Sequence, residues 1–143
     1  MDFCCKIRIT KSTIRRPGSS SPHVSRPRAE WSDLAFAWEA ARHVKSNAIV
    51  IAKEAPFWHW IGSAEPGSKA SLIAIKRAGD RVAGSVLASD AFFPFADSIE
   101  AAVQAGVTAI AHPGGSMREN QVIEAAEAAG ISLVVTGTRH FKH

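Results

Sequence analysis

Apolar positions in this chain fall into short runs, separated by stretches with helical periodicity. Four of the runs have the length and composition of strands that are covered on both faces: residues 47–53, 84–89, 107–112 and 131–137. Between the later runs, residues 97–106 and 116–130 carry apolar side chains at helical spacing and end at Gly106 and Gly130, as helices often do. Connections this short favour consecutive β-α-β units. The pattern therefore predicts an α/β fold with a layered, mainly parallel sheet and helices on both faces.

The same pattern predicts two helices in the first half of the chain. One apolar face repeats at intervals of three and four residues, at Trp31, Leu34, Trp38 and Ala41. Ser32 or Asp33 can cap the start of this helix, because a short polar side chain accepts a hydrogen bond from a free backbone N–H group. A shorter helix is expected from Ser71. Ser116 and Glu119 have the spacing of a capping box at the start of the last helix.

Basic residues are concentrated near the N-terminus, and this changes the meaning of the net charge of +4. Residues 1–30 hold 7 basic and 2 acidic residues, a balance of +5, whereas residues 31–143 hold 10 basic and 11 acidic residues, a balance of −1. A nearly neutral folded part argues against nucleic-acid binding. We predict one domain at 30–143 and an unrelated, disordered basic leader at 1–29. The leader's Arg- and Ser-rich composition is also that of a transit peptide.

Two further classes of protein are excluded by composition. Cys4 and Cys5 are adjacent and have no second cysteine pair, so they do not make a zinc site. No stretch of the sequence reaches the roughly 18 apolar residues that a membrane-spanning helix needs. We therefore expect no bound metal and no membrane partner.

Three polar or aromatic segments follow the last three predicted strands. They are SDAFFPFAD at 89–97, HPGGS at 112–116 and TRHFKH at 138–143. Ligands of parallel sheets bind beyond the carboxyl ends of the strands, which all lie at one edge. The sequence therefore predicts that these three segments meet at that edge and form a site.

The segment SDAFFPFAD is the most informative of the three. It sets three phenylalanines and a proline between two acids: Phe92, Phe93, Pro94 and Phe95, between Asp90 and Asp97. The aromatic side chains could wall a flat heteroaromatic ligand, while a carboxylate accepts two N–H groups of its ring. Equally, the segment could fill the core while Asp97 only caps the following helix. The residues alone leave both interpretations open.

Each of the other candidates also has a structural explanation. The glycines of HPGGS can present backbone N–H groups to an anion at a helix N-terminus, or form only a tight turn. Arg139 could bind a phosphate or carboxylate, and the histidines beside it could transfer protons. Charged chain ends are, however, commonly solvated. Asn47 could hold a substrate amide or be an ordinary turn residue.

Three stretches together resemble the C-terminal part of the bifunctional purine biosynthesis protein family: HVKSNAIVIAK, LASDAFFPFADSIEAAVQAGVTAIAHPGGS and TGTRHFKH. That family carries 5-aminoimidazole-4-carboxamide ribonucleotide (AICAR) formyltransferase and IMP cyclohydrolase on one chain. The resemblance runs from about Glu30 to His143. It implies a cytidine-deaminase-like fold without zinc, a homodimer in the intact protein and a cytoplasmic location. It also implies AICAR as substrate and 10-formyltetrahydrofolate as co-substrate.

The resemblance assigns roles to individual residues. Asn47 would orient the substrate carboxamide and His143 would line the reacting centre, so both are candidate catalytic residues. Six further residues would bind the two ligands: Asp97 at the pterin ring, Phe92, Pro94 and Phe95 as its walls, Ser116 lining the site, and Arg139 at the nucleotide.

Two parts of the family protein have no counterpart here. The family's catalytic Lys-His pair lies in an SFKHV-type motif, which this sequence does not contain, and the cyclohydrolase domain is missing too. We therefore expect an inactive fragment. The alternatives are a non-catalytic domain that keeps a folate or nucleotide pocket, and a subunit that completes a split enzyme in trans. Absence of the other half should also expose apolar surface.

The segment FWHWIGSAEPGSK at 57–69 departs from the family, which has a glycine-rich turn of the form G-x-G-x-G-Q-x-x-R-V there. When one base is dropped from a permitted coding of 58–68, the shifted frame reads Gly-Ile-Gly-Ser-Gly-Gln-Pro-Asn-Arg-Val. Tryptophan has one codon, so the glycines read from the codons of Trp58 and Trp60 are forced. Two compensating frame changes, near Phe57 and Lys69, would explain the segment. Trp58 and Trp60 would then occupy a turn that needs glycine conformations.

Overall fold

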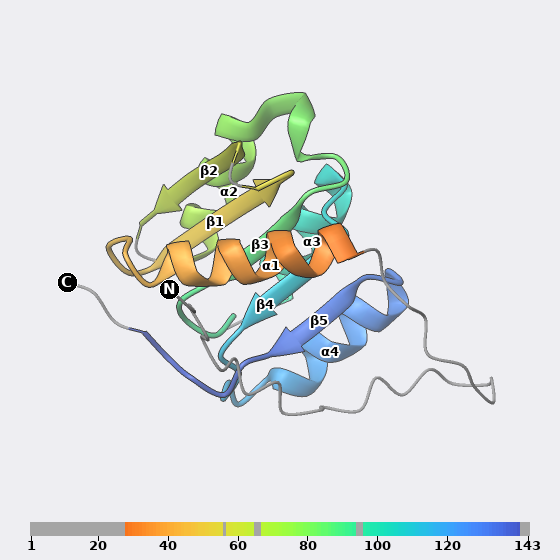
Figure 1. Ribbon diagram of the computed structural model, residues 1–143. Coiled ribbons are helices and arrows are strands. Elements are labelled where there is room, and N and C mark those ends of the chain that lie inside the picture. Colours follow the sequence, from red (N-terminus) through yellow and green to blue (C-terminus); the bar gives the residue numbers. More distant parts are fainter. Residues whose placement is uncertain (1–27, 56, 65–66, 94–95, 141–143) are drawn as a thin grey trace.

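The computed structural model describes residues 28–55, 57–64, 67–93 and 96–140 (Figure 1). The elements are α1 (Arg28–Ala41), β1 (Ala48–Lys53), β2 (Trp58–Ser63), α2 (Gly67–Ala78), the 3-10 helix η1 (Gly79–Val82), β3 (Val86–Ser89), α3 (Asp97–Ala105), β4 (Ala109–His112), α4 (Glu119–Ala128) and β5 (Ser132–Val135). Every strand and helix expected from the sequence is present. α2 begins before Ser71, and β2 is an additional strand. Residues 1–27, which make up nearly all of the expected leader, lie outside the described residues.

The five strands form one mixed sheet in the order β2-β1-β3-β4-β5. β3, β4 and β5 pair in parallel, as the β-α-β pattern predicts. β1 is antiparallel to both of its neighbours, β2 and β3, so it alone runs against the other strands (Figure 1). The predicted layered α/β sheet is confirmed. The reversal of β1 has no signature in the hydrophobic pattern, because a buried strand reads the same in either direction.

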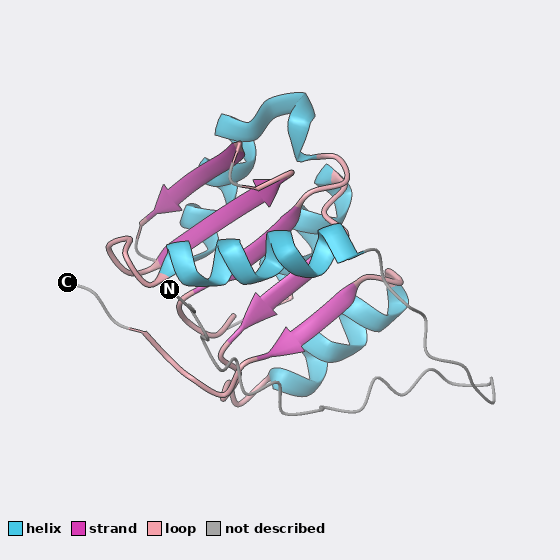
Figure 2. Cartoon of the chain, viewed as in Figure 1, coloured by secondary structure: helices cyan, strands magenta, loops and turns pink. Residues whose placement is uncertain are grey.

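Helices cover both faces of the sheet, as predicted (Figure 2). α1 lies on one face, where Leu34 and Trp38 are buried against apolar side chains of β1, β3 and β4 such as Val50. α2, α3 and α4 lie on the other face, where Ile99 and Val122 belong to the same buried cluster as alternate residues of the central strands. The sheet is therefore the middle layer of three, and its central strands are buried on both faces.

The β2 strand occupies the place where the resemblance puts a glycine turn. Trp58 and Trp60 lie in extended backbone, paired with β1, so the expectation that they occupy glycine-type turn conformations is wrong. Gly62 is the position where β2 meets α2 most closely. A Cβ atom on Gly62 would lie 2.0 Å from the carbonyl oxygen of Ala70. The shifted frame also encodes glycine at position 62 if the codon of Gly62 is GGG, and in that case the contact is compatible with both frames.

α1 begins at Arg28, ahead of the residues expected to cap it. Ser32 and Asp33 therefore lie inside the helix, and the cap prediction is wrong. Asp33 is 8% exposed, and its carboxylate accepts hydrogen bonds from the backbone N–H groups of Glu54 at 2.9 Å and Ala55 at 2.8 Å. Asp33 thus satisfies the backbone of the turn after β1 instead of the start of its own helix.

The capping box expected at the start of α4 is also wrong in detail. Ser116 Oγ accepts a hydrogen bond from the N–H of Arg118 at 3.1 Å, and Glu119 Oε2 accepts one from the N–H of Gly115 at 3.2 Å. Each acceptor bonds the N–H one residue before the one that a capping box would use. The two side chains still tie the loop to α4, which begins at Glu119.

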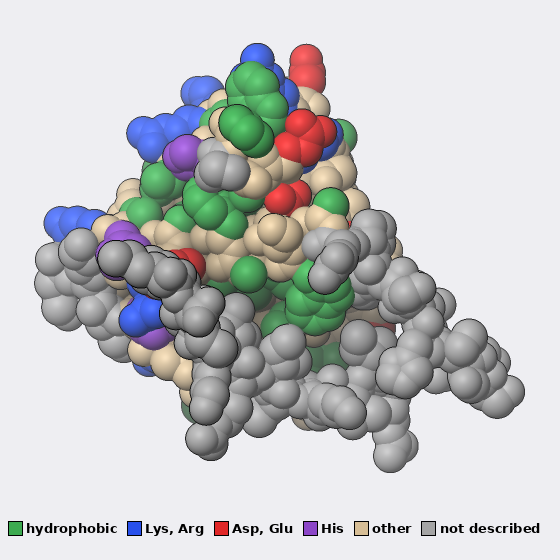
Figure 3. All heavy atoms as spheres, viewed as in Figure 1, with side chains coloured by type: hydrophobic (Ala, Val, Ile, Leu, Met, Phe, Trp, Pro, Cys, Tyr) green, Lys and Arg blue, Asp and Glu red, His purple; other side chains and the backbone are tan. Residues whose placement is uncertain are grey.

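Charged side chains of both signs gather at the top of the view in Figure 3, over η1 and the end of α2. The exposed charged residues there are Lys76, Arg77, Asp80 and Arg81. Hydrophobic side chains show lower on the same face, around α1 (Figure 3). Within the described residues, no helix has the length and apolar character needed to cross a membrane.

Candidate functional site

The carboxyl ends of β3, β4 and β5 lie at one edge of the sheet, and the three predicted segments meet there. The backbone N–H of Gly137 donates to the carbonyl of Pro113 at 3.1 Å, and that of His140 donates to the carbonyl of Asp90 at 3.3 Å. The rings of Phe93 and His112 lie 5.5 Å apart between centroids. Backbone and ring contacts therefore join the segments that follow all three strands.

Asn47 reaches the same edge because β1 runs against β3. It directly precedes β1, whose start lies beside the end of β3. The carboxylate of Asp90 accepts hydrogen bonds from the Ser46 hydroxyl at 2.5 Å and from the Ala48 N–H at 2.7 Å. One buried side chain at the end of β3 thus binds the chain on both sides of Asn47.

Arg139 lies against Phe92, so two of the predicted site residues are in direct contact. The guanidinium carbon of Arg139 is 4.8 Å from the centroid of the Phe92 ring. A guanidinium at this distance is attracted by the electrons of the ring face. The contact lays the segment after β5 across the segment after β3, and Figure 1 shows the chain after β5 turning back toward the end of α1.

His140, the next residue, packs against α1. Its ring centroid is 5.2 Å from that of Trp38. Burial lowers the pKa of His140, and the positive charge of Arg42 lowers it further, while Glu39 and Asp90 act in the opposite direction. His140 is therefore uncharged at neutral pH, which suits a ring that is packed on an indole.

Asp97 and Ser116 lie on the neighbouring segments without bonding to this group. Asp97 is exposed at the start of α3, and its Oδ1 accepts a hydrogen bond from the N–H of Ser98 at 2.8 Å. The hydroxyl of Ser116 is bonded to the loop before α4. Within the described residues, neither side chain forms a hydrogen bond with Asn47 or Arg139. Three other candidates lie outside the described residues: Pro94, Phe95 and His143.

His112 is a residue of this edge that the sequence interpretation missed. It ends β4 with 1% of its surface exposed, and neither ring nitrogen has a hydrogen-bond partner in the described part of the chain. Burial lowers the pKa of His112 to about 4, although the charge of Glu119 opposes that shift. The sequence offered one signal. His112 is the last residue of an apolar run, and side chains of such a strand face the covered sides of the sheet or the edge where the strand ends.

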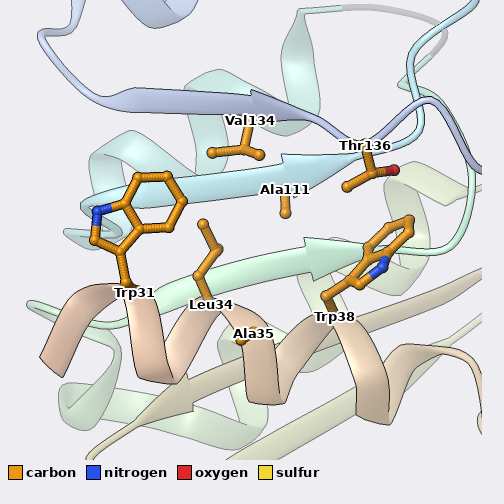
Figure 4. A pocket seen from close by; sticks show the side chains of 7 residues that line it. All are labelled: Trp31, Leu34, Ala35, Trp38, Ala111, Val134 and Thr136. Atoms are coloured by element: carbon orange, nitrogen blue, oxygen red, sulfur yellow. The ribbon is translucent and has the colours of Figure 1, made fainter. Parts of the chain in front are cut away.

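A separate apolar groove lies beside α1 (Figure 4). In Figure 4 the side chains of Trp31, Leu34 and Trp38 extend from α1 toward β4 and β5. The whole lining consists of Trp31, Leu34, Ala35, Trp38, Ala111, Val134 and Thr136. Trp31 is 40% exposed, although it belongs to the predicted apolar face of the helix. Of the other lining residues, Leu34, Trp38 and Ala111 are buried, so Trp31 is the exposed apolar side chain at this groove.

A second cavity, of about 260 Å³, lies at the other end of the sheet between β2 and η1. Both of its basic side chains have partners in the chain: the guanidinium of Arg81 lies 4.3 Å from the centroid of the Trp58 ring, and Lys53 Nζ donates to the carbonyl of Ala83 at 2.8 Å. Among the residues that the structure describes, no cluster of three His, Cys, Asp or Glu side chains could hold a metal ion.

Comparison with known proteins shows which family this chain resembles. The AICARFT/IMPCHase bienzyme family matches residues 12–64. The bifunctional purine biosynthesis protein PurH of Anoxybacillus flavithermus is 56% identical over 115 residues, which cover 80% of this chain and 22% of that protein. The PurH protein of Rhodopirellula baltica is 54% identical over 114 residues, covering 79% and 22%. This chain belongs to the AICARFT/IMPCHase bienzyme family.

The chain spans only part of its AICARFT/IMPCHase relatives. It covers 22% of the Anoxybacillus protein and 26% of the PurH protein of Bacillus thuringiensis strain Al Hakam, to which it is 46% identical over 136 residues. The Bacillus match takes in 94% of this chain, and the family match begins at residue 12. Both therefore include part of the segment expected to be an unrelated leader, and the boundary at 30 stays a prediction.

Among solved structures, the chain is similar to Acinetobacter baumannii RibD. In its form 1 the TM-score is 0.48 at 16% identity, over 76% of this chain and 34% of that one. In form 2 the TM-score is 0.46 at 15% identity.

Proposed function

We propose that this chain carries the C-terminal part of the formyltransferase site of purine biosynthesis. In that reaction a formyl group passes from 10-formyltetrahydrofolate to the amine of AICAR. The observation that carries the proposal is the contact between Arg139 and Phe92, beside the loop that holds Asn47. Three residues from three distant parts of the chain, each assigned to a ligand by the family resemblance, lie at one sheet edge.

The chemistry of these residues fits the two ligands. The exposed carboxylate of Asp97 can accept two N–H groups from a pterin ring, and the Phe92 ring offers it an aromatic surface. The guanidinium of Arg139 lies 4.8 Å from the centroid of the Phe92 ring, and its planar fork of N–H donors matches a phosphate group in bidentate fashion. Asn47 can bond the carboxamide of AICAR and so orient the neighbouring amine.

We propose further that the chain has no turnover by itself. Formyl transfer needs a group that moves a proton from the attacking amine. The family's Lys-His motif has no counterpart in this sequence. Of the two described histidines at this edge, His112 is too deeply buried to reach a ligand and His140 is packed on Trp38, while His143 lies outside the described residues. A homodimeric assembly and a cytoplasmic location remain predictions from the resemblance.

Calorimetric titration of the purified chain tests the binding, and a formyl-transfer assay tests the chemistry. We expect AICAR and a non-transferring folate analogue each to bind the chain, with Arg139→Gln weakening AICAR. A matched control is Arg77→Gln, because Arg77 donates to the carbonyl of Ile61 on β2, away from this edge. Binding of neither ligand would refute the proposal, and formyl transfer by the chain alone would refute the lack of turnover.

The apolar groove favours a second candidate function, completion of a split enzyme in trans. Trp31 is 40% exposed and borders the apolar groove of α1, β4 and β5, whose other lining residues include the buried Leu34 and Trp38 (Figure 4). Tryptophan is enriched at contacts between proteins, so the exposed Trp31 is the residue of this groove on which the candidate rests. The rest of a family protein is the partner that this candidate requires.

Mixing experiments distinguish the second candidate from the first. The chain would be added to the Anoxybacillus relative truncated to remove its matching region, and formyl transfer would be measured. Restored activity that Trp31→Ala abolishes is the expected result. Trp58→Ala serves as control, because Trp58 is exposed to a similar degree, 43% against 40%, but lies on β2. If no mixture is active, the candidate is excluded.

A further inference from the structure

We infer that Asp90 is the positioning residue of this edge, and that its bond to the Ser46 hydroxyl sets the orientation of Asn47. This inference rests on the proposed function and adds two residues to it. Neither Asp90 nor Ser46 would touch a ligand in this arrangement. They act through the backbone that they hold.

Asp90 binds both flanks of Asn47 with one carboxylate. Oδ2 accepts from the Ser46 hydroxyl at 2.5 Å and Oδ1 accepts from the Ala48 N–H at 2.7 Å. The backbone N–H of Asp90 also donates to the carbonyl of Ala48 at 3.2 Å. The backbone of Asn47 cannot turn without breaking one of these bonds, so they hold the position of its Cα atom and the direction in which its side chain leaves the backbone.

The backbone of Asp90 holds the other side of the site. Its carbonyl accepts from the N–H of His140 at 3.3 Å, which fixes the residue next to Arg139. Phe92 follows Asp90 by two residues and receives the guanidinium of Arg139. The side chain of Asp90 therefore orders the Asn47 loop, while its main chain orders the contact between Phe92 and Arg139.

Burial makes the carboxylate effective in this role. Asp90 is 1% exposed, and a buried carboxylate is strongly disfavoured unless donors surround it. Hydrogen bonds to a charged acceptor are about twice as strong as neutral ones, so a hydroxyl and an N–H bound to it are held firmly. Removing one donor leaves the carboxylate in place and frees one flank of Asn47.

The side chain and the main chain of Asp90 hold different parts of the site. A variant that affects only one part therefore separates a positioning role from a purely structural one. Ser46→Ala removes the hydroxyl bond to Asp90 on the Asn47 side and leaves the bond between the Asp90 carbonyl and His140 intact. The chain would lose affinity for AICAR by about tenfold, the usual effect of one charge-assisted hydrogen bond. Affinity for the folate analogue, which is assigned to the Phe92 side, would change by less than about twofold. Ser46→Thr keeps a hydroxyl and would restore AICAR binding.

Calorimetric titration of the 143-residue chain and its variants with AICAR and with the folate analogue measures both affinities. The control is Ser85→Ala, because the buried Ser85 hydroxyl has no hydrogen-bond partner in the described part of the chain and lies just before β3, away from this edge. The inference is overturned if the unmodified chain binds both ligands and Ser46→Ala weakens both equally or neither. If the unmodified chain binds neither ligand, the proposed function itself fails, and the inference fails with it.

Discussion

The guanidinium of Arg139 lies on the ring of Phe92, 4.8 Å from its centroid. Phe92 follows β3 and Arg139 follows β5, and the strand β4 separates those two strands in the sheet. The contact therefore spans the strand between them and closes the edge where Asn47 also lies. The Arg139–Phe92 contact thus brings together candidate residues that lie far apart in the sequence.

A double-mutant cycle should detect this contact. Phe92→Leu and Arg139→Gln would each lower stability, and the coupling between them should be about 0.5–1 kcal/mol, the usual value for a cation beside an aromatic face. Urea unfolding of the two single variants and the double variant measures it. The pair Phe92→Leu with Arg77→Gln should give no coupling, since Arg77 bonds β2 instead. Additive effects in both cycles would show that the Arg139–Phe92 contact is absent in solution.

Asp33 should be important for stability although it lies in the middle of a helix. Asp33→Ala leaves the N–H groups of Glu54 and Ala55 without their carboxylate, and we expect a loss of about 2 kcal/mol in the free energy of unfolding. Ser32→Ala, at the exposed neighbouring position, should change stability little. Equal effects of the two substitutions would mean that Asp33 does not hold the turn after β1.

His112 should make the protein sensitive to mild acid. Its pKa is about 4 when folded and near 6.5 when unfolded, so the unfolded chain binds more protons between these values. The contribution of His112 to stability is therefore complete above about pH 6.5 and is lost as the pH falls toward 4, by about 3 kcal/mol in total.

Urea unfolding between pH 4 and pH 7 measures this dependence against His112→Leu. The variant should lack this part of the slope, and at pH 7 it should be at least as stable as the parent. Its leucine leaves no buried ring nitrogen without a partner. Parallel pH profiles for parent and variant would show that His112 is not buried in its neutral form.

Gly62 should tolerate no side chain. In Gly62→Ala the new methyl group would meet the carbonyl oxygen of Ala70 at 2.0 Å, so β2 and α2 would have to separate. We expect a loss above about 3 kcal/mol, since backbone atoms cannot give way as a flexible side chain can. Gly137→Ala is the control, because its Cβ meets no atom within 4 Å and the cost there is only that of a left-handed backbone, about 1 kcal/mol. A smaller loss at Gly62 than at Gly137 would contradict the close approach of β2 and α2.

Resequencing the coding DNA tests the origin of residues 57–69. We expect the frame shifted by one base to encode Gly-Ile-Gly-Ser-Gly-Gln-Pro-Asn-Arg-Val from the position of Trp58. The expected coding requires GGG at Gly62, which would keep glycine at the residue of β2 where α2 leaves no room for a Cβ atom. If the shifted frame does not encode that glycine sequence, the hypothesis of two compensating frame changes is refuted.

Much of the fold follows from local sequence. Apolar runs and helical periodicity marked β1, β3, β4, β5 and the helices, because burial on both faces and a turn of 3.6 residues are properties of consecutive residues. The meeting of three segments at one edge followed from parallel pairing alone. β2 was not predicted, because its two tryptophans and a histidine do not form a regular apolar run. Its strand conformation is stabilised by pairing with β1, which the local sequence does not reveal.

The sequence by itself determined the α/β class, the three segments of the edge and the residue types that can bind a folate or a nucleotide. Tertiary structure decided the direction of β1, and with it that Asn47 reaches this edge. It also decided that Asp33 bonds a turn, that Asp90 bonds the residues on both sides of Asn47, and that neither ring nitrogen of His112 has a hydrogen-bond partner in the described part of the chain. The physical reason is the same in each case. A side chain's partners come from strands and loops far away in the sequence, and packing and hydrogen bonding choose among them only when the chain is folded.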